Sequence, residues 1–299
     1  MLNILKKTLL VVITLLLIDQ LVGRTLIWIN EGTMKGDYGR NTYIATQACQ
    51  DILIFGSSRA IHHYDPTLIG ETLGMTCYNC GEDGMGIILM YARLQLILQR
   101  HTPKVIIYDI EPSYDLLEDD NTRYLGFLRP FYDNDTIKRI CVDVSPSERF
   151  KNLSMLYRFN SRWVDIIAQR ISRDPSQARD YTWAPLHDRL NAEPSLNAES
   201  PILNYDPLKL KYLQRLIECC ANNDIALYFV TSPNFGNTDD KVYSPLKELA
   251  AANNIPVLNH SIDTTFTRHP ELFNDRDHLN QRGATLLTKM AIQEINNQD

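Results

Sequence analysis

The sequence predicts an α/β protein: a three-layer α/β/α sandwich with a five-stranded, mainly parallel sheet, preceded by an N-terminal membrane helix. Short, continuous apolar runs alternate with segments of helical periodicity, which is typical of parallel strands covered by helices on both faces. Loops rich in glycine, serine and acidic residues follow several of these runs. A pair of lysines followed by a long apolar run lies near the start of the chain. These three observations set the fold class.

The composition is that of a folded globular protein. The 299 residues are 44% hydrophobic and 22% charged, and the formal net charge is −6. Disorder is excluded for the bulk of the chain, because low hydrophobicity and a large charge excess are both absent. Nucleic-acid binding is disfavoured, since it needs a basic surface that displaces counterions. The six cysteines predict small buried side chains rather than a disulfide framework, and we expect neither a metal nor another cofactor.

Five strands and four long helices follow from the apolar pattern. The strands are expected at Asp51–Phe55, Met75–Asn79, Lys104–Ile110, Ile225–Val230 and Ile255–Leu258. The helices are expected at Ile87–Gln99, Asp206–Ala221, Ser244–Asn253 and Gln281–Ile295. Asp206 followed by Pro207 is typical of an N-cap and a first helical position.

The predicted organisation has three parts. Residues 1–29 form the membrane helix, residues 30–50 a connector, and residues 51–299 the α/β domain. The stretch 113–205 breaks the alternation, and we interpret it as a helical and loop insertion over the active edge of the sheet. A structural subdomain without substrate contact explains the same stretch equally well.

The N-terminal segment predicts an uncleaved signal anchor. Lys6 and Lys7 precede the apolar run Thr8–Ile18, and no clear A-x-A-like cleavage site follows. Because positive charges stay on the cytoplasmic side, the rest of the chain would be extracytoplasmic, in a periplasm or at the cell surface. Asp19 would then lie at the outer interface, since a carboxylate inside a bilayer is costly. The alternative is an amphipathic helix packed on a cytoplasmic domain, because the run is short for a full span.

Two loops carry residues suited to nucleophilic catalysis. In Gly56-Ser57-Ser58-Arg59, after the first strand, a serine would lie on a tight turn near helix N-terminal amides that stabilise an oxyanion. In Asp275-Arg276-Asp277-His278, before the last helix, the first aspartate can accept the Nδ1–H of the histidine and leave Nε2 as a base. Together the two loops predict a nucleophile, a base and an orienting carboxylate. His62 and His63 are expected at the surface or the substrate rim.

On these motifs the chain resembles the SGNH/GDSL hydrolase superfamily over about residues 51–292. Gly56-Ser57-Ser58 is similar to the Gly-Asp-Ser of the first block, which implies that Ser58 rather than Ser57 is the nucleophile. The stretch Asn79–Gly84 is similar to the second block, which implies an oxyanion hole formed by the amides of Ser58 and Gly84. Asp275 and His278 are similar to the last block. The resemblance also implies a flavodoxin-like strand arrangement.

The third block departs from the family pattern. The family usually has Gly-x-Asn-Asp after the third strand, and the asparagine is a third oxyanion donor; this chain has Glu111-Pro112-Ser113-Tyr114-Asp115. Ser113 and Tyr114 are the candidates to replace it, and the sequence does not choose between them. Loss of one such donor typically costs about 2.7–4 kcal/mol in the transition state. A weak or specialised enzyme follows, or one whose hole is completed by a substrate or partner.

Arg59 and Glu111 are candidate residues of the substrate rim. Asp109 and Glu111 could also assist a proton relay. A structural role is the more common one for carboxylates at such an edge, as capping groups or as ion-pair partners of an arginine such as Arg59.

The resemblance implies a serine esterase or O-acyltransferase that forms an acyl-Ser58 intermediate. Its substrate would be an acyl ester, most simply acetyl, of an envelope or exported glycan, or a small acyl ester. The expected partners are this substrate and the membrane, with no nucleic acid. A non-catalytic binding or assembly module of the cell envelope is the alternative that the missing asparagine favours. A flavodoxin-like nucleotide binder is disfavoured, because Gly56-Ser57-Ser58-Arg59 lacks a full phosphate-binding glycine pattern.

Overall fold

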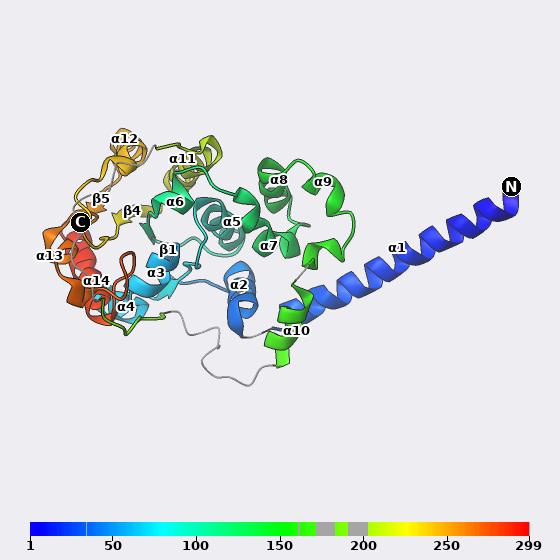
Figure 1. Ribbon diagram of the computed structural model, residues 1–299, viewed down its shortest axis with the longest axis horizontal. Helices are drawn as coiled ribbons and strands as arrows, with labels where there is room; N and C mark the ends of the chain where they lie inside the picture. The colour runs from blue at the N-terminus through cyan, green and yellow to red at the C-terminus, as the bar shows by residue number, and fades with distance from the viewer. Residues whose placement is uncertain (34, 161, 172–182, 191–202, 299) are drawn as a thin grey trace. The chain divides into compact units, whose positions relative to one another are not determined.

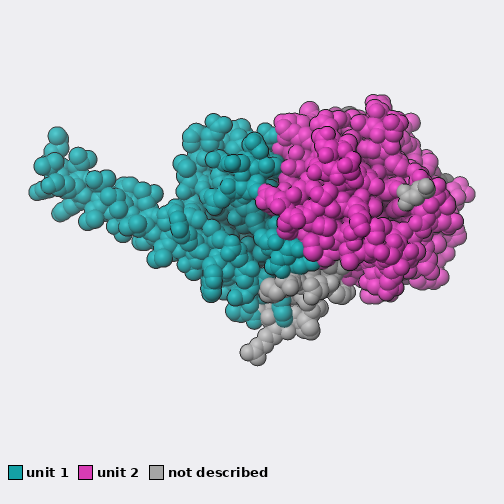
Figure 2. Space-filling model, turned by 180° about the vertical axis from the view of Figure 1, so that it is seen from behind, with its two compact units in different colours: residues 1–47, 121–181 teal, residues 48–120, 182–299 magenta. Residues whose placement is uncertain are grey.

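The computed structural model describes residues 1–33, 35–160, 162–171, 183–190 and 203–298. They form two compact units, coloured separately in Figure 2. Unit 1 comprises residues 1–47 and 121–181, and unit 2 comprises residues 48–120 and 182–299. Residues 172–182 and 191–202, which belong to the predicted insertion at 113–205, lie outside the described residues.

Unit 2 contains a five-stranded sheet whose strands are all parallel (Figure 1). The strands, β1 to β5 in chain order, are Ile52–Gly56, Cys77–Asn79, Val105–Asp109, Ala226–Thr231 and Val257–Asn259. Their order in the sheet is β2-β1-β3-β4-β5, which is the flavodoxin-like order. The predicted fold class is therefore confirmed, and each strand end lies within two residues of its expected position.

Helices cover both faces of this sheet. On one face α3 (Ser58–His63), α4 (Pro66–Leu73) and α14 (Gln281–Asn296) pack together, and on the other α5 (Ile87–Ile97) packs against α11 (Pro207–Asn222). The remaining described elements of unit 2 are α6 (Pro112–Asp115), α12 (Ser244–Ala252), α13 (Thr264–Thr267), η5 (Lys241–Tyr243) and η6 (Pro270–Leu272). The four predicted long helices correspond to α5, α11, α12 and α14.

The sequence pattern explains how these layers form. Ile52 and Ile54 alternate along β1 and join the same buried cluster as Leu287 and Ala291 of α14. Because alternate strand residues point to opposite faces, one strand supplies side chains to both helical layers. Asp206 caps α11 as predicted, since its carboxylate accepts hydrogen bonds from the amides of Leu208 and Lys209.

Unit 1 is helical in its described residues. Its helices are α1 (Leu2–Glu31), α2 (Gly36–Thr46), α7 (Leu125–Leu128), α8 (Asp135–Val144), α9 (Glu148–Lys151) and α10 (Trp163–Ile171), with 3₁₀ turns η1 (Asn121–Tyr124), η2 (Arg129–Phe131) and η3 (Tyr157–Phe159). Residues 36–46, expected within a polar connector, instead form α2. Tyr38 of this helix packs into a small core with Leu26, Phe159 and Ile166, and this burial explains why the segment is helical.

The N-terminal helix α1 is long and apolar. Its best 18-residue window has a mean hydropathy of 2.0, and every residue from Met1 to Ile18 is exposed. A helix of 30 residues is about 45 Å long, enough to cross a bilayer. These properties are compatible with a single-pass anchor or a signal sequence.

Candidate active site

Ser58 lies at the carboxyl end of β1, where ligands bind in open parallel sheets. β1 is flanked by β2 on one side and β3 on the other, so this edge is the switch point of the strand order. Gly56 makes the turn with φ 138°, and a Cβ at this position would lie 2.5 Å from the carbonyl oxygen of Asp109. Glycine therefore lets β1 end close against β3. Ser57 caps α3, and Ser58 is its first residue.

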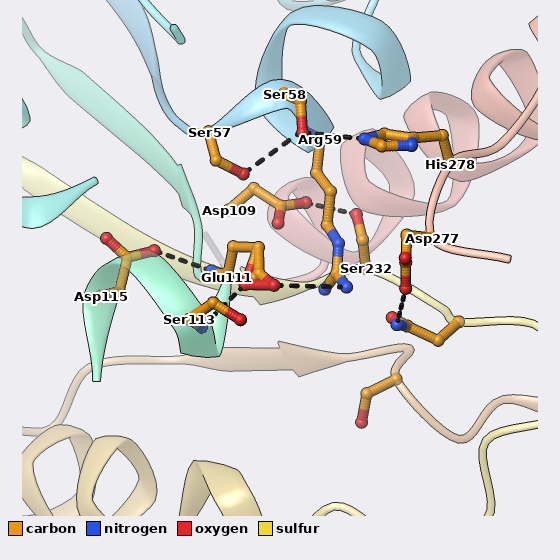
Figure 3. A network of polar contacts seen from close by, with 12 residues as sticks. Ser57, Ser58, Arg59, Asp109, Glu111, Ser113, Asp115, Ser232, Asp277 and His278 are labelled. Carbon is orange, nitrogen blue, oxygen red and sulfur yellow. Dashed lines mark hydrogen bonds and ion pairs between the residues drawn. The ribbon is translucent and has the colours of Figure 1, made fainter. Parts of the chain in front are cut away.

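The structure brings Ser58 and His278 together across 220 positions of the chain (Figure 3). Ser58 Oγ lies 2.8 Å from His278 Nε2. On the other side of the ring, Nδ1 lies 3.0 Å from both carboxylate oxygens of Asp275. This order of contacts is that of a nucleophile, a base and an orienting carboxylate. The Ser58 side chain is half-buried and the imidazole is 25% exposed, so the pair is reachable from solvent.

Asp275 is fixed by its own loop as well as by the histidine. Its Oδ1 accepts hydrogen bonds from the backbone amides of Asp277 and His278, each at 2.9 Å. Burial raises the pKa of this carboxyl, but these amides and the charge of His278 outweigh burial and lower the pKa below its ordinary value. An ionised carboxylate at this place holds the proton of the imidazole on Nδ1 and leaves Nε2 to accept one.

The loop after β2 lies beside the turn that carries Ser58. The amide of Glu82 donates to the carbonyl of Gly56 at 3.1 Å. The Glu82 carboxylate forms a buried ion pair with the Arg93 guanidinium at 2.6 Å, and this contact holds the loop against α5. Gly84 follows with φ 68°, a left-handed conformation that favours glycine. The predicted oxyanion residues Ser58 and Gly84 thus belong to neighbouring loops at one sheet edge.

The segment after β3 contains the two candidates for a third oxyanion donor. Ser113 is an exposed residue of α6, and Figure 3 shows it on the far side of Glu111 from Ser58. The carbonyl of Tyr114 lies against Gly86, where a Cβ would be 2.4 Å away. Asp115 holds the turn: its carboxylate accepts from the Glu111 amide and the Tyr108 hydroxyl, each at 2.7 Å. Burial raises the pKa of Asp115 to about 7.

Arg59 is inside the protein rather than at a substrate rim. It is 3% exposed, its guanidinium lies 3.8 Å from Glu111 Oε1, and it donates to the Tyr243 hydroxyl at 3.4 Å. The expectation of a rim arginine is therefore wrong. A buried guanidinium has lost its hydration, and its charge is stabilised by a nearby anion instead of by solvent. The ion pair between Arg59 and Glu111 is the structural role that the sequence also offered.

A buried polar chain lies behind the site, and sequence reasoning missed it. The expectation that His63 lies at the surface or the substrate rim is wrong, because this residue is fully buried. His63 Nε2 accepts a hydrogen bond from the Leu279 amide at 3.0 Å, so the ring proton is on Nδ1 and is donated to Ser232 Oγ at 3.0 Å. The Ser232 hydroxyl in turn donates to Asp109 Oδ2, which also accepts from the Tyr64 hydroxyl. Burial holds the pKa of His63 well below its ordinary value, in agreement with a neutral ring.

Burial also raises the pKa of Asp109, to about 6, against the opposing effects of Arg59 and the two hydroxyl donors. The chain of contacts ties β3 and the end of α3 to the residue that follows His278. These contacts therefore affect the position of His278, the candidate base.

His62 lies beside the catalytic histidine candidate. Its ring centroid is 5.8 Å from that of His278. Its Nδ1 donates to the Ala184 carbonyl, and its Nε2 lies 3.3 Å from Asp83. Burial lowers the pKa of His62, but the Asp83 carboxylate and the Ala184 carbonyl outweigh it, so the pKa is raised.

Part of the predicted insertion contacts both site loops. The indole of Trp183 donates to the His62 carbonyl at 3.2 Å, and the Gln281 amide donates to the Leu186 carbonyl at 2.7 Å. Residues 183–190 thus join the end of α3 to the loop that carries Asp275 and His278. Two hollows of about 550 and 500 Å³ are formed among described residues elsewhere, at the edge of β5 and around Asp51 and Gly74, and neither is lined by Ser58 or His278.

Comparison with known proteins gives similarity to solved structures. No protein-family model matches the sequence, and no curated protein matches it. A candidate acylhydrolase of Bacteroides fragilis is 12% identical with a TM-score of 0.43, covering 86% of this chain and 94% of its own. An acetyl xylan esterase is 14% identical with a TM-score of 0.42 (82% and 99% covered). A GDSL-like lipase of Bacteroides thetaiotaomicron is 11% identical with a TM-score of 0.37 (82% and 88% covered). At these identities the similarity concerns the fold alone.

Proposed function

We propose that this protein is a membrane-anchored serine esterase or acyltransferase of the SGNH type, acting outside the cytoplasm on acyl esters, most simply acetyl, of a glycan. One observation carries the proposal: Ser58 Oγ lies 2.8 Å from His278 Nε2, while His278 Nδ1 lies 3.0 Å from the Asp275 carboxylate. The sequence resemblance and the apolar helix α1 supply the ester class and the anchor.

The first half-reaction follows from these contacts. Ser58 Oγ forms a bond to the acyl carbonyl carbon as its proton passes to His278 Nε2. Collapse of the tetrahedral intermediate breaks the ester bond, and the protonated imidazole gives its proton to the leaving alkoxide. The products of this step are acyl-Ser58 and the free alcohol.

The second half-reaction decides between hydrolase and transferase. Nε2 takes a proton from water or from another alcohol, which attacks the acyl-Ser58 carbonyl and regenerates the serine. The two outcomes share the same residues and differ in whether water is excluded. Residues 183–190, which contact both site loops, are where such exclusion would be controlled.

The oxyanion hole of the proposed enzyme is formed by the amides of Ser58 and Gly84. Ser58 is the first residue of α3, so the helix N-terminus adds its positive dipole end to this place. With Ser113 lying beyond Glu111, the third donor would be Tyr114, or a group of the substrate or of a partner. This arrangement suits a selective enzyme that turns over simple esters slowly.

A fluorophosphonate probe tests the proposal, because it reacts with a serine that an adjacent base activates. We expect labelling of the full-length protein in detergent and its loss in Ser58→Ala. Ser57→Ala is the matched control, since Ser57 is buried and adjacent yet has no contact with His278 in the described structure. It should keep the label.

Failure of the folded wild-type protein to react, with weak-ester hydrolysis unchanged in Ser58→Ala, would contradict catalysis. That outcome would select the alternative, a non-catalytic module of the cell envelope that retains the sheet. Binding of an acetylated glycan without release of acetate would then be the expected activity.

A further inference from the structure

The loop after α9 is attached to α1 at the residue where the apolar run ends. Asp19 accepts hydrogen bonds from the Ser154 hydroxyl at 2.5 Å and from the amides of Met155 and Leu156 at 2.9 and 3.2 Å. These contacts all lie within unit 1, and Figure 1 shows the loop beside the middle of α1. If the apolar turns before Asp19 cross a membrane, this loop is held at the membrane surface.

The direction of the loop along α1 is set by a second contact. Met155 packs against Gly23, where a Cβ would lie 2.3 Å from the Met155 Cβ. Ser154, one residue earlier, bonds to Asp19, which is one helical turn nearer to the apolar run. Followed from Met155 back to Ser154, the loop therefore runs toward the apolar turns of α1.

The side chains that this loop exposes are apolar and basic. Phe150 is 70% exposed, Leu153 is 76% exposed and Leu156 is 37% exposed. Arg149 and Lys151, on either side of Phe150, are exposed as well. Single exposed apolar residues are ordinary, but three within seven positions, flanked by basic residues, are typical of a segment that lies in a lipid interface.

We propose that the segment Glu148–Leu156, here called the interface loop, is a second membrane contact of this protein. Phe150, Leu153 and Leu156 enter the boundary between headgroups and acyl chains, and Arg149 and Lys151 pair with phosphate of anionic lipids. The occupant is the bilayer because the loop is continuous with the surface of α1 that the membrane covers. This inference rests on the anchoring part of the proposed function and not on its chemistry.

The contact has a mechanical consequence for unit 1. A single helix in a bilayer leaves the rest of a chain free to tilt relative to the membrane plane. Because Asp19 joins the helix to the interface loop, a second attachment point beside the helix axis restricts that tilt. Unit 1 would then keep one face toward the lipid surface.

Depth-dependent quenching in vesicles tests the proposal on the full chain. In a Cys49→Ser background, which removes the exposed cysteine, Leu153→Cys is labelled with an environment-sensitive fluorophore and reconstituted into vesicles of phosphatidylethanolamine and phosphatidylglycerol. Lipids carrying a quencher near the headgroup should quench this label several-fold more than a label at Arg139→Cys, an exposed position of α8. Leu10→Cys, within the apolar run, is read with lipids that carry the quencher near the end of the acyl chains, and reports whether α1 inserts.

The outcomes distinguish failure of the interface loop from failure of the α1 anchor. Quenching at both positions 10 and 153 supports the interface loop. Quenching at 10 with a water-like label at 153 overturns the loop and leaves the anchor standing, whereas no quenching at 10 removes the anchor and this inference together. A label at 153 that is shielded from water yet not quenched by lipid shows a second copy or another protein on the loop, and also overturns it. Arg149→Gln with Lys151→Gln should weaken quenching at 153 more with phosphatidylglycerol present than without it.

Discussion

The backbone amide of Leu279 donates a hydrogen bond to Nε2 of His63 at 3.0 Å. This contact joins the last residue of α3, the helix that Ser58 begins, to the residue that follows His278. The two halves of the candidate catalytic pair are thus tied through a buried imidazole as well as through their own hydrogen bond. The geometry of the site therefore depends on a residue that does not touch the reacting atoms.

Removal of this imidazole should loosen the site and the fold together. His63→Ala leaves the Leu279 amide without its acceptor, removes one of the hydrogen-bond partners of Ser232 and creates a cavity, so we expect a loss of about 2–4 kcal/mol in the free energy of unfolding. The kcat for a model ester should fall more than KM changes, because the base is displaced. Urea denaturation and steady-state kinetics measure the two effects. His269→Ala, which removes an exposed histidine paired with Glu271, is the control and should resemble wild type. Equal stability of the two variants would refute the role of His63.

Asp275 should affect rate more than folding. Asp275→Ala removes the acceptor that keeps the His278 proton on Nδ1, and we expect kcat to fall by about 10²–10⁴-fold. Asp277→Asn is a matched change two residues away, where the carboxylate bonds to Asn234 instead, and should leave kcat close to wild type. Kinetics with an acetyl ester at neutral pH decide between them. Similar rates in the two variants would show that Asp275 does not orient the base.

The pKa of Asp109 predicts how stability depends on pH. Burial raises this pKa from 3.8 to about 6, so the folded state holds the proton more tightly than the unfolded state. Stability from this group is present below pH 4 and is lost as pH rises to about 6, by on the order of 2–3 kcal/mol. Asp109→Asn should flatten the plot of unfolding free energy against pH between pH 4 and 6, whatever its effect on stability at a single pH. Urea midpoints across pH 4–7 measure it, and an unchanged slope would contradict the assignment.

The depressed pKa of Asp275 makes stability depend on pH in the opposite direction. Its contribution is present above the unfolded value of 3.8 and is lost only as pH falls through the lower folded value. The two carboxyls therefore act in different pH ranges, and the flattening expected for Asp109→Asn should leave the acid limb of the curve in place.

The turn between β1 and α3 should tolerate only glycine at position 56. Gly56→Ala combines φ 138° with a Cβ placed 2.5 Å from the Asp109 carbonyl oxygen, and we expect a loss of about 3 kcal/mol or more. Gly74→Ala is the control: φ is 65° but no atom lies within 4 Å of the new Cβ, so the cost should be about 1 kcal/mol. Thermal or urea unfolding measures both losses. Probe labelling of Ser58 should also fall in Gly56→Ala, and equal losses of stability would show that the close approach to β3 is not limiting.

The order of the elements and the local motifs could be predicted from the sequence. Continuous apolar runs predict buried parallel strands, and Asp206-Pro207 predicts where α11 begins, because both signals arise between residues near in sequence. A serine in the turn after β1 and the pair Asp275 and His278 could be named for the same reason, whereas the choice of Ser58 over Ser57 came from the resemblance to the SGNH/GDSL superfamily. A turn after a strand and an i, i+3 contact are local geometry, which a sequence records directly.

Tertiary structure alone decided what distant residues do to one another. The 2.8 Å contact of Ser58 with His278, the burial of Arg59 against Glu111, and the chain from Asp109 through Ser232 to His63 join positions that no spacing relates. The same is true of Asp19, which a hydropathy argument places at an interface but which the fold binds to Ser154. The physical reason is that hydrogen bonds and ion pairs depend on distances of a few ångströms, and between distant segments these are set by the packing of strands and helices.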